Sequence, residues 1–196
     1  MHEAIKHETG AMLHAAGHRI SIEPPNAYTN SNKRPDIRMI DHFSVGAHRD
    51  LDIGTISVTG KICDNAALTD GYGADQVEYD KYSKWDHVAE AEGNKMTIIA
   101  YELGGRFGGE ALAFFNEIAR DSTTTSAAAN AFKNYWLRRI ATVAQRALGR
   151  LIRARLPSSS LSLPRGLRAQ SDPLAHVVHA PNPATINARA RGPALL

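Results

Sequence analysis

Three aspartates stand in two segments that are predicted to form neighbouring β-strands, and their carboxylates are the first candidates for chemistry. Asp36 opens a strand predicted over 35–40, and Asp50 and Asp52 lie in the next strand, predicted over 49–58. The short link between the two strands predicts antiparallel pairing, which can bring acids from both strands together. Clustered carboxylates repel each other unless a cation joins them, and such oxygen ligands suit Mg²⁺ or Mn²⁺, which can support phosphodiester hydrolysis. For any single aspartate, the alternative is a turn or cap carboxylate at a strand end.

Two lysines fall on the face of a predicted helix, 74–92, that should point inward. The residues of this face, at helical steps of three and four, are Val77, Lys81, Lys84, Trp85 and Val88. A buried ammonium group without a partner is costly, so we expect these lysines to face carboxylates or to extend to the edge of the core. Glu78 lies three residues before Lys81 and is a possible partner. A lysine beside the aspartates could orient water or neutralise phosphate charge, and the alternative is an ordinary surface ion pair.

The elements that must position these groups can be read from hydrophobic periodicity and from turn residues. In chain order they are a helix over 3–16, strands over 19–23, 35–40 and 49–58, a helix over 74–92, a strand over 95–103, and helices over 111–119 and 127–155. The segments 24–34, 41–49 and 60–73 are predicted to be turns or loops because of their Pro, Asn, Gly and Asp residues. The predicted order is therefore α-β-β-β-α-β-α-α over residues 1–155. The segment 156–196 is basic and rich in Pro, Ser and Ala, without periodicity, and is expected to be disordered.

Charge is distributed unevenly along the 196 residues, although the formal net charge is only +3. Residues 1–121 hold 12 Lys and Arg against 19 Asp and Glu, a net charge of −7, and the remainder holds 11 against one, a net charge of +10. Basic side chains neutralise phosphates, so we expect a nucleic-acid contact through Arg34, Lys133, Arg138, Arg139, Arg146 and Arg150. The alternative is a solvated basic helix followed by a disordered tail.

The cysteine content and the chain ends bear on the cellular compartment. Cys63 is the only cysteine, which excludes a disulfide framework and a CxxC zinc pair and favours a reducing compartment. The first residues lack the apolar core of a signal peptide, and no apolar run approaches the length of a membrane span. We expect a soluble, intracellular protein that does not have a membrane as a partner.

Three segments together resemble the signature of restriction-endonuclease-like domains, of the PD-(D/E)xK superfamily, in non-LTR retrotransposon polyproteins. They are KRPDI (33–37), DLDI (50–53) and EYDKYSKW (78–85), and flanking segments such as TIIAYELGG and NYWLRRIATVAQRAL are also similar. The likeness covers about residues 1–155. It implies an α/β (α+β) fold with a three-layer core around a mixed sheet. It also implies a Mg²⁺- or Mn²⁺-dependent endonuclease that nicks target DNA for reverse transcription, in the nucleus if the element is eukaryotic.

Carried over by position, the resemblance assigns roles to five residues. It implies that Asp36 and Asp52 are metal-binding catalytic acids and that Lys81 is the catalytic lysine. Lys84 and Trp85 would support them, and from their positions we also expect Glu78 and Asp50 to be supporting residues. We also consider Glu23 and Glu102, which lie near strand ends, as possible supporting groups.

The sequence departs from the family pattern at two positions. The superfamily commonly places its lysine two residues after the second acid on the same strand, but Gly54 occupies that position here. Trp85 stands where the retrotransposon branch usually has tyrosine. The choice between Asp50 and Asp52 as second ligand stays open, with Asp52 preferred because it lies between Leu51 and Ile53 inside the apolar strand.

Two other functions compete with an active endonuclease. The first is a module that keeps the fold and binds nucleic acid but no longer cuts it. The second is a helical interaction protein that binds a partner through the apolar stripe of the last helix, which consists of Phe132, Trp136, Ile140, Val143, Ala147 and Leu151. Because the chain begins at Met1 with no reverse transcriptase ahead of it, we expect a stand-alone remnant of a retroelement. The sequence indicates neither the target site nor the oligomeric state.

Overall fold

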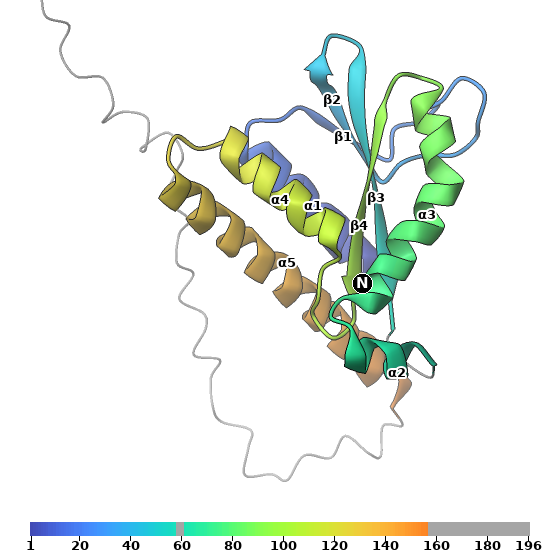
Figure 1. Cartoon of the computed structure of the whole chain (residues 1–196), viewed down its shortest axis with the longest axis vertical. Helices are drawn as coiled ribbons and strands as arrows, with labels where there is room; N and C mark the ends of the chain where they lie inside the picture. Colours follow the sequence, from blue (N-terminus) through green and yellow to red (C-terminus); the bar gives the residue numbers. More distant parts are fainter. Residues whose placement is uncertain (58–60, 157–196) are drawn as a thin grey trace, which may run out of the picture. The chain divides into compact units, whose positions relative to one another are not determined.

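The computed structural model of the chain describes residues 1–57 and 61–156. Within these residues it has five helices and four strands (Figure 1). They are α1 (His2–Ala15), β1 (Ile20–Ile22), β2 (Ile37–Ser44), β3 (Ala47–Ile56), α2 (Lys61–Leu68), α3 (Tyr72–Glu90), β4 (Lys95–Glu102), α4 (Gly109–Asp121) and α5 (Ser126–Arg155). The compact unit of interest spans Met1–Arg153. The tail predicted over 156–196 lies, from residue 157 onward, outside the described residues.

The four strands form one mixed sheet in the order β1-β2-β3-β4. The pairs β1–β2 and β2–β3 are antiparallel, and β3–β4 is parallel. The antiparallel pairing expected for the strands that carry the aspartates is thus confirmed. A parallel neighbour needs a crossover, and α2 and α3 supply it between β3 and β4. The mixed α/β class expected from the sequence is also confirmed.

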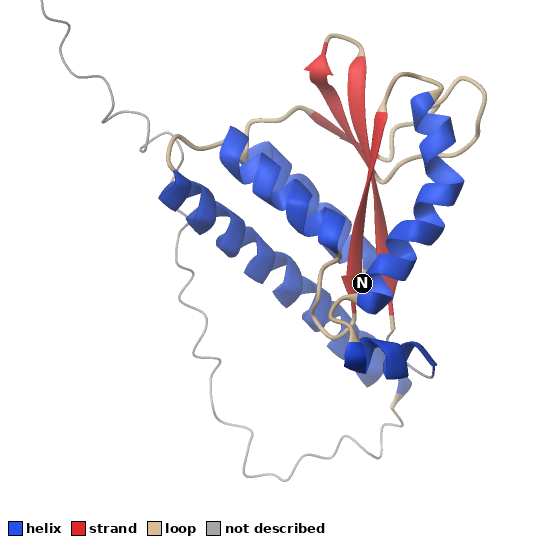
Figure 2. Cartoon of the chain, viewed as in Figure 1, coloured by secondary structure: helices blue, strands red, loops and turns tan. Residues whose placement is uncertain are grey.

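Helices cover both faces of the sheet (Figure 2). Met96, Ile98 and Ala100 of β4 pack beneath α3, whereas Ile99 and Tyr101, which alternate with them, pack against α1, α4 and α5. This is why the strand reads as a continuous apolar run: both of its faces are buried. Every group on β3 that faces α3 therefore lies in a layer separate from α1, α4 and α5.

The structure corrects the prediction for two segments. Residues 60–73, predicted as a loop, contain the helix α2 at Lys61–Leu68, because Ala66, Ala67 and Leu68 favour helix although Gly and Asp flank them. The predicted turn 41–49 is mostly strand, since β2 extends to Ser44 and β3 begins at Ala47. The observed order is therefore α-β-β-β-α-α-β-α-α.

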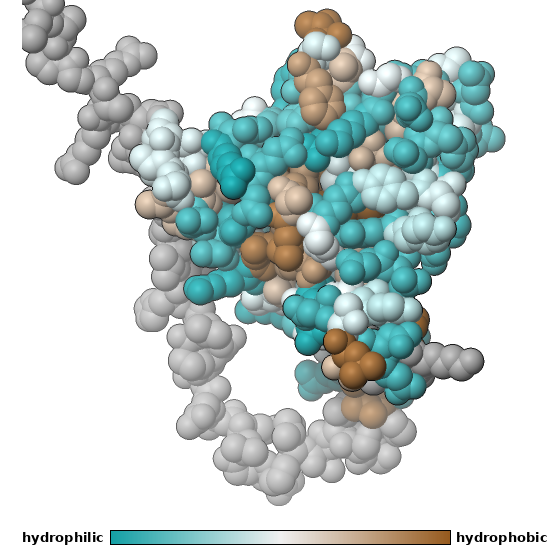
Figure 3. Space-filling view, viewed as in Figure 1, coloured by the Kyte–Doolittle hydropathy of each residue, from teal (hydrophilic) through white to brown (hydrophobic). Residues whose placement is uncertain are grey.

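The hairpin between β2 and β3 turns at Gly46, whose φ of 83° favours glycine. Its tip exposes Phe43 and Val45 and forms an apolar patch in Figure 3.

The apolar stripe of α5 packs within the domain over most of its length. Trp136 and Ile140 are buried in the core, and Phe132 packs against it, whereas Leu151 at the end of the predicted stripe is 49% exposed. The interaction-protein alternative requires an exposed Trp136, so the burial of this residue removes its basis. No helix in the described part of the chain is long and apolar enough to cross a membrane.

Candidate active centre

The pairing of β2 with β3 brings Asp36 and Asp52 together. Its register joins Ile37 to Leu51, and continuing it by one residue places Asp36 opposite Asp52. Leu51 and Ile53 point into the core on the side of α1, α4 and α5. Because side chains alternate along a strand, Asp52 points to the opposite face, beneath α3. Both aspartates are buried.

Asp36 is held by groups from two other elements. Its Oδ2 accepts a hydrogen bond from the Ile53 N–H at 2.6 Å and lies 2.9 Å from Nε2 of His2 in α1. Burial alone would raise the pKa of Asp36, but hydrogen bonds from His2 and Ile53 lower it below its usual value. The pKa of His2 is raised in turn, chiefly by its hydrogen bond with Asp36. Asp36 is therefore an ionised carboxylate in a fixed position.

Asp52 is paired with Lys81, which reaches down from α3. The pKa of Asp52 is raised to about 6, chiefly by burial and also by the neighbouring Asp36, against the opposing effect of Lys81. Burial thus outweighs the single ion pair. The structure brings the three predicted catalytic residues together as two adjacent carboxyl groups and one ammonium group.

Gly54 explains how a lysine from α3 can reach a strand. A Cβ built at Gly54 would overlap Cγ1 of Val77 and would lie 3.1 Å from Cε of Lys81. The absence of a side chain therefore lets α3 lie close to β3 and leaves a path for the Lys81 stem toward Asp52. A lysine on the strand at this position would compete for the space that Val77 and Lys81 fill.

Asp50, the alternative second acid, has a different environment. Its side chain is fully buried and receives a bidentate pair from Arg38 at 2.7 and 2.8 Å. Tyr28 donates to it at 2.8 Å, and Asn94 donates at 3.3 Å. Four hydrogen bonds satisfy this carboxylate, so it acts as an internal anchor for three elements of the fold. The geometry favours Asp52 over Asp50 as the second acid of the centre.

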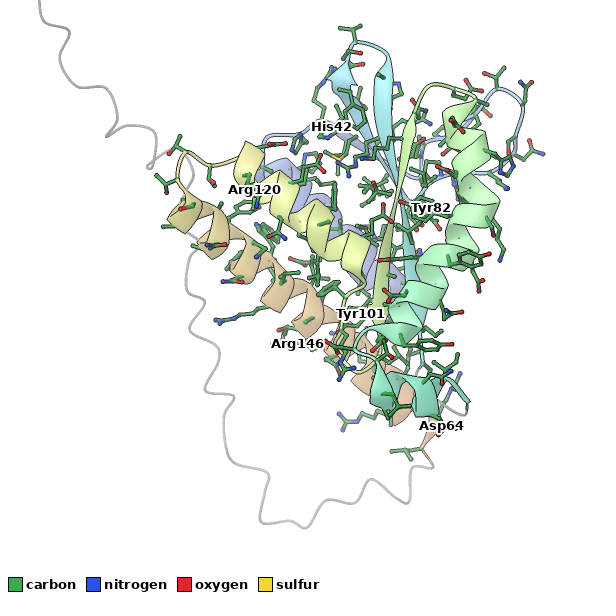
Figure 4. The ribbon with its side chains drawn as sticks, in the orientation of Figure 1. His42, Asp64, Tyr82, Tyr101, Arg120 and Arg146 are labelled. Carbon is green, nitrogen blue, oxygen red and sulfur yellow. The ribbon has the colours of Figure 1, made fainter. Side chains whose placement is uncertain are left out.

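Glu78 points away from the centre, toward the beginning of α4. A Cβ at Gly108 would overlap its carboxylate, and among the described ion pairs none joins Glu78 to Lys81. Burial raises the pKa of Glu78 to about 7, with a further contribution from Glu110. Tyr82, which extends from α3 toward the sheet in Figure 4, donates a hydrogen bond to Glu110. Glu78 thus belongs to an acidic cluster between α3 and α4.

The inward face predicted for the helix over 74–92, which is α3 in the structure, is correct except at Lys84. Val77, Trp85 and Val88 pack against the buried residues beneath α3, but Lys84 is exposed. Trp85 lies 6.4 Å from the ring of Tyr28, measured between ring centroids. It packs beneath α3 at the edge of the domain.

A polar network at the amino end of α1 is not among the features predicted from the sequence. Lys6 is 1% exposed and donates to Glu3 at 2.7 Å and to Glu23, while Arg34 bonds Glu23 at 2.8 Å. The apolar spacing that predicts this helix gives no sign of these contacts. The available signal was the placement of His2 and Lys6 four residues apart, on one helical face. Glu23, considered above as a supporting group, is held here by two cations.

Glu102, the other possible supporting group, caps a helix. It is 2% exposed, and its Oε1 accepts hydrogen bonds from the N–H groups of Gly73 at 2.9 Å and Ala74 at 3.2 Å. These are free donors in the first turn of α3, so a carboxylate there stabilises the helix start.

The predicted basic residues divide between two faces of the domain. Arg34 is exposed close to the centre, two residues before Asp36. The others lie on α5, which packs on the face of the sheet opposite α3. Lys133 binds Asn116 at 2.8 Å, and Arg139 pairs with Glu8. Arg138, Arg146 and Arg150 are exposed.

Within residues 1–57 and 61–156, no group of three or more His, Cys, Asp or Glu is arranged to hold a metal ion. The acidic groups that the centre could offer to a metal ion are the carboxylates of Asp36 and Asp52. Neither a protein-family model nor a curated protein matches the sequence.

Proposed function

We propose that this chain is a metal-dependent DNA endonuclease with a restriction-endonuclease-like fold of the PD-(D/E)xK superfamily. The observation that carries the proposal is the convergence of Asp36, Asp52 and Lys81 from β2, β3 and α3. Two adjacent carboxyl groups can hold a divalent cation, and an ammonium group beside them can stabilise the charge that develops during phosphodiester hydrolysis.

The arrangement of the elements supports the same proposal. A leading helix, three antiparallel strands, a crossover helix and a parallel fourth strand follow one another in the order predicted from periodicity, and the mixed sheet with helices on both sides is compatible with the three-layer core that the resemblance implies. The additional helix α2 lies within the crossover and leaves this order otherwise unchanged.

The donor set fits a small divalent cation. Mg²⁺ in nucleotide-processing sites is commonly bound by one or two carboxylates, and waters and substrate phosphate oxygens complete its coordination. Asp36 and Asp52 match this requirement, since both are hard oxygen ligands and lie side by side. When bound, Mg²⁺ or Mn²⁺ would supply Lewis acidity and lower the pKa of a coordinated water.

The protein's own groups have distinct tasks in this proposal. His2 and the Ile53 N–H fix the Asp36 carboxylate in one orientation. Lys81 places its ammonium group beside Asp52, where it can donate to a phosphate oxygen and balance the charge that develops there. Asp50 keeps β2 and β3 in register through Arg38, so that Asp36 stays opposite Asp52.

DNA would approach on the side of the centre that carries Arg34, which is exposed beside Asp36. Within a retroelement, the nick would supply the 3′ hydroxyl group from which reverse transcription starts. The competing function is a module that binds nucleic acid without cutting it. Metal-dependent cleavage distinguishes the two, because only the endonuclease would show it.

The test is nicking of supercoiled plasmid by the full chain with Mg²⁺ or Mn²⁺ and with EDTA. We expect metal-dependent nicking that Asp36→Asn, Asp52→Asn and Lys81→Ala each abolish. Lys84→Ala is the matched control, because it removes an exposed lysine from the same helix and should leave nicking unchanged. Absence of nicking with retained, salt-sensitive DNA binding would favour the non-cutting module, and loss of activity in Lys84→Ala would contradict the assignment of Lys81.

A further inference from the structure

A polar pocket lies close to the candidate centre, and of its lining residues only Arg34 has a part in the function proposed above. The segment between β1 and β2 forms it, with a volume of about 670 Å³, within the range of small-molecule and cofactor sites. Its lining includes two amides, Asn26 and Asn32, two hydroxyl groups, Thr29 and Ser31, and the cation Arg34. Such a lining suits a ligand that combines hydrogen-bonding edges with negative charge.

The pocket is anchored to the rest of the domain and does not depend on a ligand for its shape. Tyr28 is 4% exposed and donates to the buried carboxylate of Asp50. Thr29 donates from its backbone N–H and from its hydroxyl to Glu92 after α3, at 2.7 and 3.1 Å. Asn26 adopts a φ of 51°, a backbone conformation that asparagine tolerates better than most residues. The walls are therefore preformed, which reduces the entropy lost when a ligand binds.

One end of the pocket is cationic and is connected to the candidate centre. Arg34 bonds Glu23 at 2.8 Å, and the Glu23 N–H donates to the carbonyl of Asp36 at 2.9 Å. Lys33 lies at the same end, with its Nζ 5.5 Å from the centre of the Trp85 ring. These contacts connect the cationic end of the pocket to the chain segment that carries Asp36.

We propose that this pocket binds one unstacked nucleotide of the DNA strand, next to the phosphate that is cut. Arg34 and Lys33 would hold its phosphate, and Asn26 and Asn32 would hydrogen-bond the edges of its base. The edges of a base can reach Asn26 and Asn32 together only when that base has left the duplex stack, so the preferred substrate is single-stranded or locally opened DNA. This inference rests on the proposed endonuclease and names the form of its substrate.

The test is equilibrium binding of a short fluorescent single-stranded deoxyoligonucleotide, and of the blunt duplex of the same sequence, to the full chain in EDTA. The double variant Asn26→Gly/Asn32→Ala, in which glycine tolerates the φ of 51° at residue 26, should lower the affinity for the single strand about tenfold and leave that for the duplex nearly unchanged. Asn30→Ala is the matched control, since Asn30 is exposed in the same segment but does not line the pocket. This control should bind as the wild type does.

Three results would overturn the inference: no measurable single-strand binding by the wild type, an unchanged affinity in the double variant, or an equal loss on strand and duplex. The Asp36→Asn variant separates this inference from the proposed activity. This variant should bind the single strand with at least wild-type affinity, because it changes one carboxylate of the centre and keeps every residue that lines the pocket. Plasmid nicking without pocket-dependent binding would overturn the pocket alone, and pocket-dependent binding without nicking would overturn the endonuclease alone.

Discussion

Replacing Gly54 by alanine tests whether the contact between α3 and β3 depends on a missing side chain. The added Cβ would overlap Cγ1 of Val77 and would lie 3.1 and 3.3 Å from Cε and Cδ of Lys81. Lysine methylenes can move, but Val77 is stiff at χ1 and sits on the turn of α3 that faces the strand. The helix must therefore shift outward, and the Lys81 ammonium group moves away from Asp52.

The expected cost follows from overpacking in a close contact. We expect Gly54→Ala to lower the free energy of unfolding by about 1–3 kcal/mol. Val77→Ala removes the methyl group that is overlapped, so the pair Gly54→Ala/Val77→Ala should be more stable than the sum of the single changes predicts. The coupling between the two sites should amount to about 0.5–3 kcal/mol in the favourable direction.

The assay is urea unfolding of the four proteins of this cycle, followed by circular dichroism. The same proteins are then compared in plasmid nicking, where Gly54→Ala should be slower than the wild type because Lys81 is displaced. A Gly54→Ala protein with wild-type stability, or strictly additive effects of the two substitutions, would refute the reasoning that glycine is required for the approach of α3.

Three other predictions concern groups in and around the centre. Asp50→Ala should cost about 3–5 kcal/mol in urea unfolding because it leaves the partly buried guanidinium of Arg38 unpaired, whereas Asp52→Asn should change stability by less than about 1 kcal/mol; equal losses would contradict the distinction. Because the folded-state pKa of Glu78 is about 7 against an ordinary value of 4.5, its contribution to stability is present below about pH 4.5 and is lost as the pH rises through about 7. The free energy of unfolding of the wild type should fall by about 1–2 kcal/mol more than that of Glu78→Gln over this interval, and parallel pH profiles would refute the assignment. Arg34→Ala should weaken DNA binding and reduce its salt dependence by about one phosphate contact, more than Arg146→Ala on the opposite face does, and the reverse order would place the DNA on α5.

Much of the fold follows from local patterns that the sequence displays directly. The predictions of β3, β4 and the long helices are confirmed. In each of them the apolar pattern extends over many residues, so a single polar residue does not obscure it. The meeting of Asp36 with Asp52 follows from one antiparallel register. The contact of Lys81 with Asp52 is predictable in part, because Lys81 lies on the same inward helical face as Val77 and Trp85.

The features that were not predicted depend on contacts between distant segments. Nothing near Asp50 in the sequence indicates that Arg38, Tyr28 and Asn94 converge on it. Glu78 lies three residues from Lys81, but its side chain points to the beginning of α4. Gly108 has no side chain and leaves room there for the Glu78 carboxylate.

The short helix α2 was missed for a different reason: glycine and aspartate dominate its flanks, and only eight residues carry the helical signal.

The most direct test of the account is whether the two aspartates bind a divalent cation. Calorimetric titration of the full chain with Mn²⁺ should detect a binding site that Asp36→Asn and Asp52→Asn each remove. Glu78→Gln, which changes a buried carboxyl outside the centre, should keep that site. No binding by the wild type, or binding that survives both aspartate substitutions, would contradict the claim that Asp36 and Asp52 form the metal site of a nuclease.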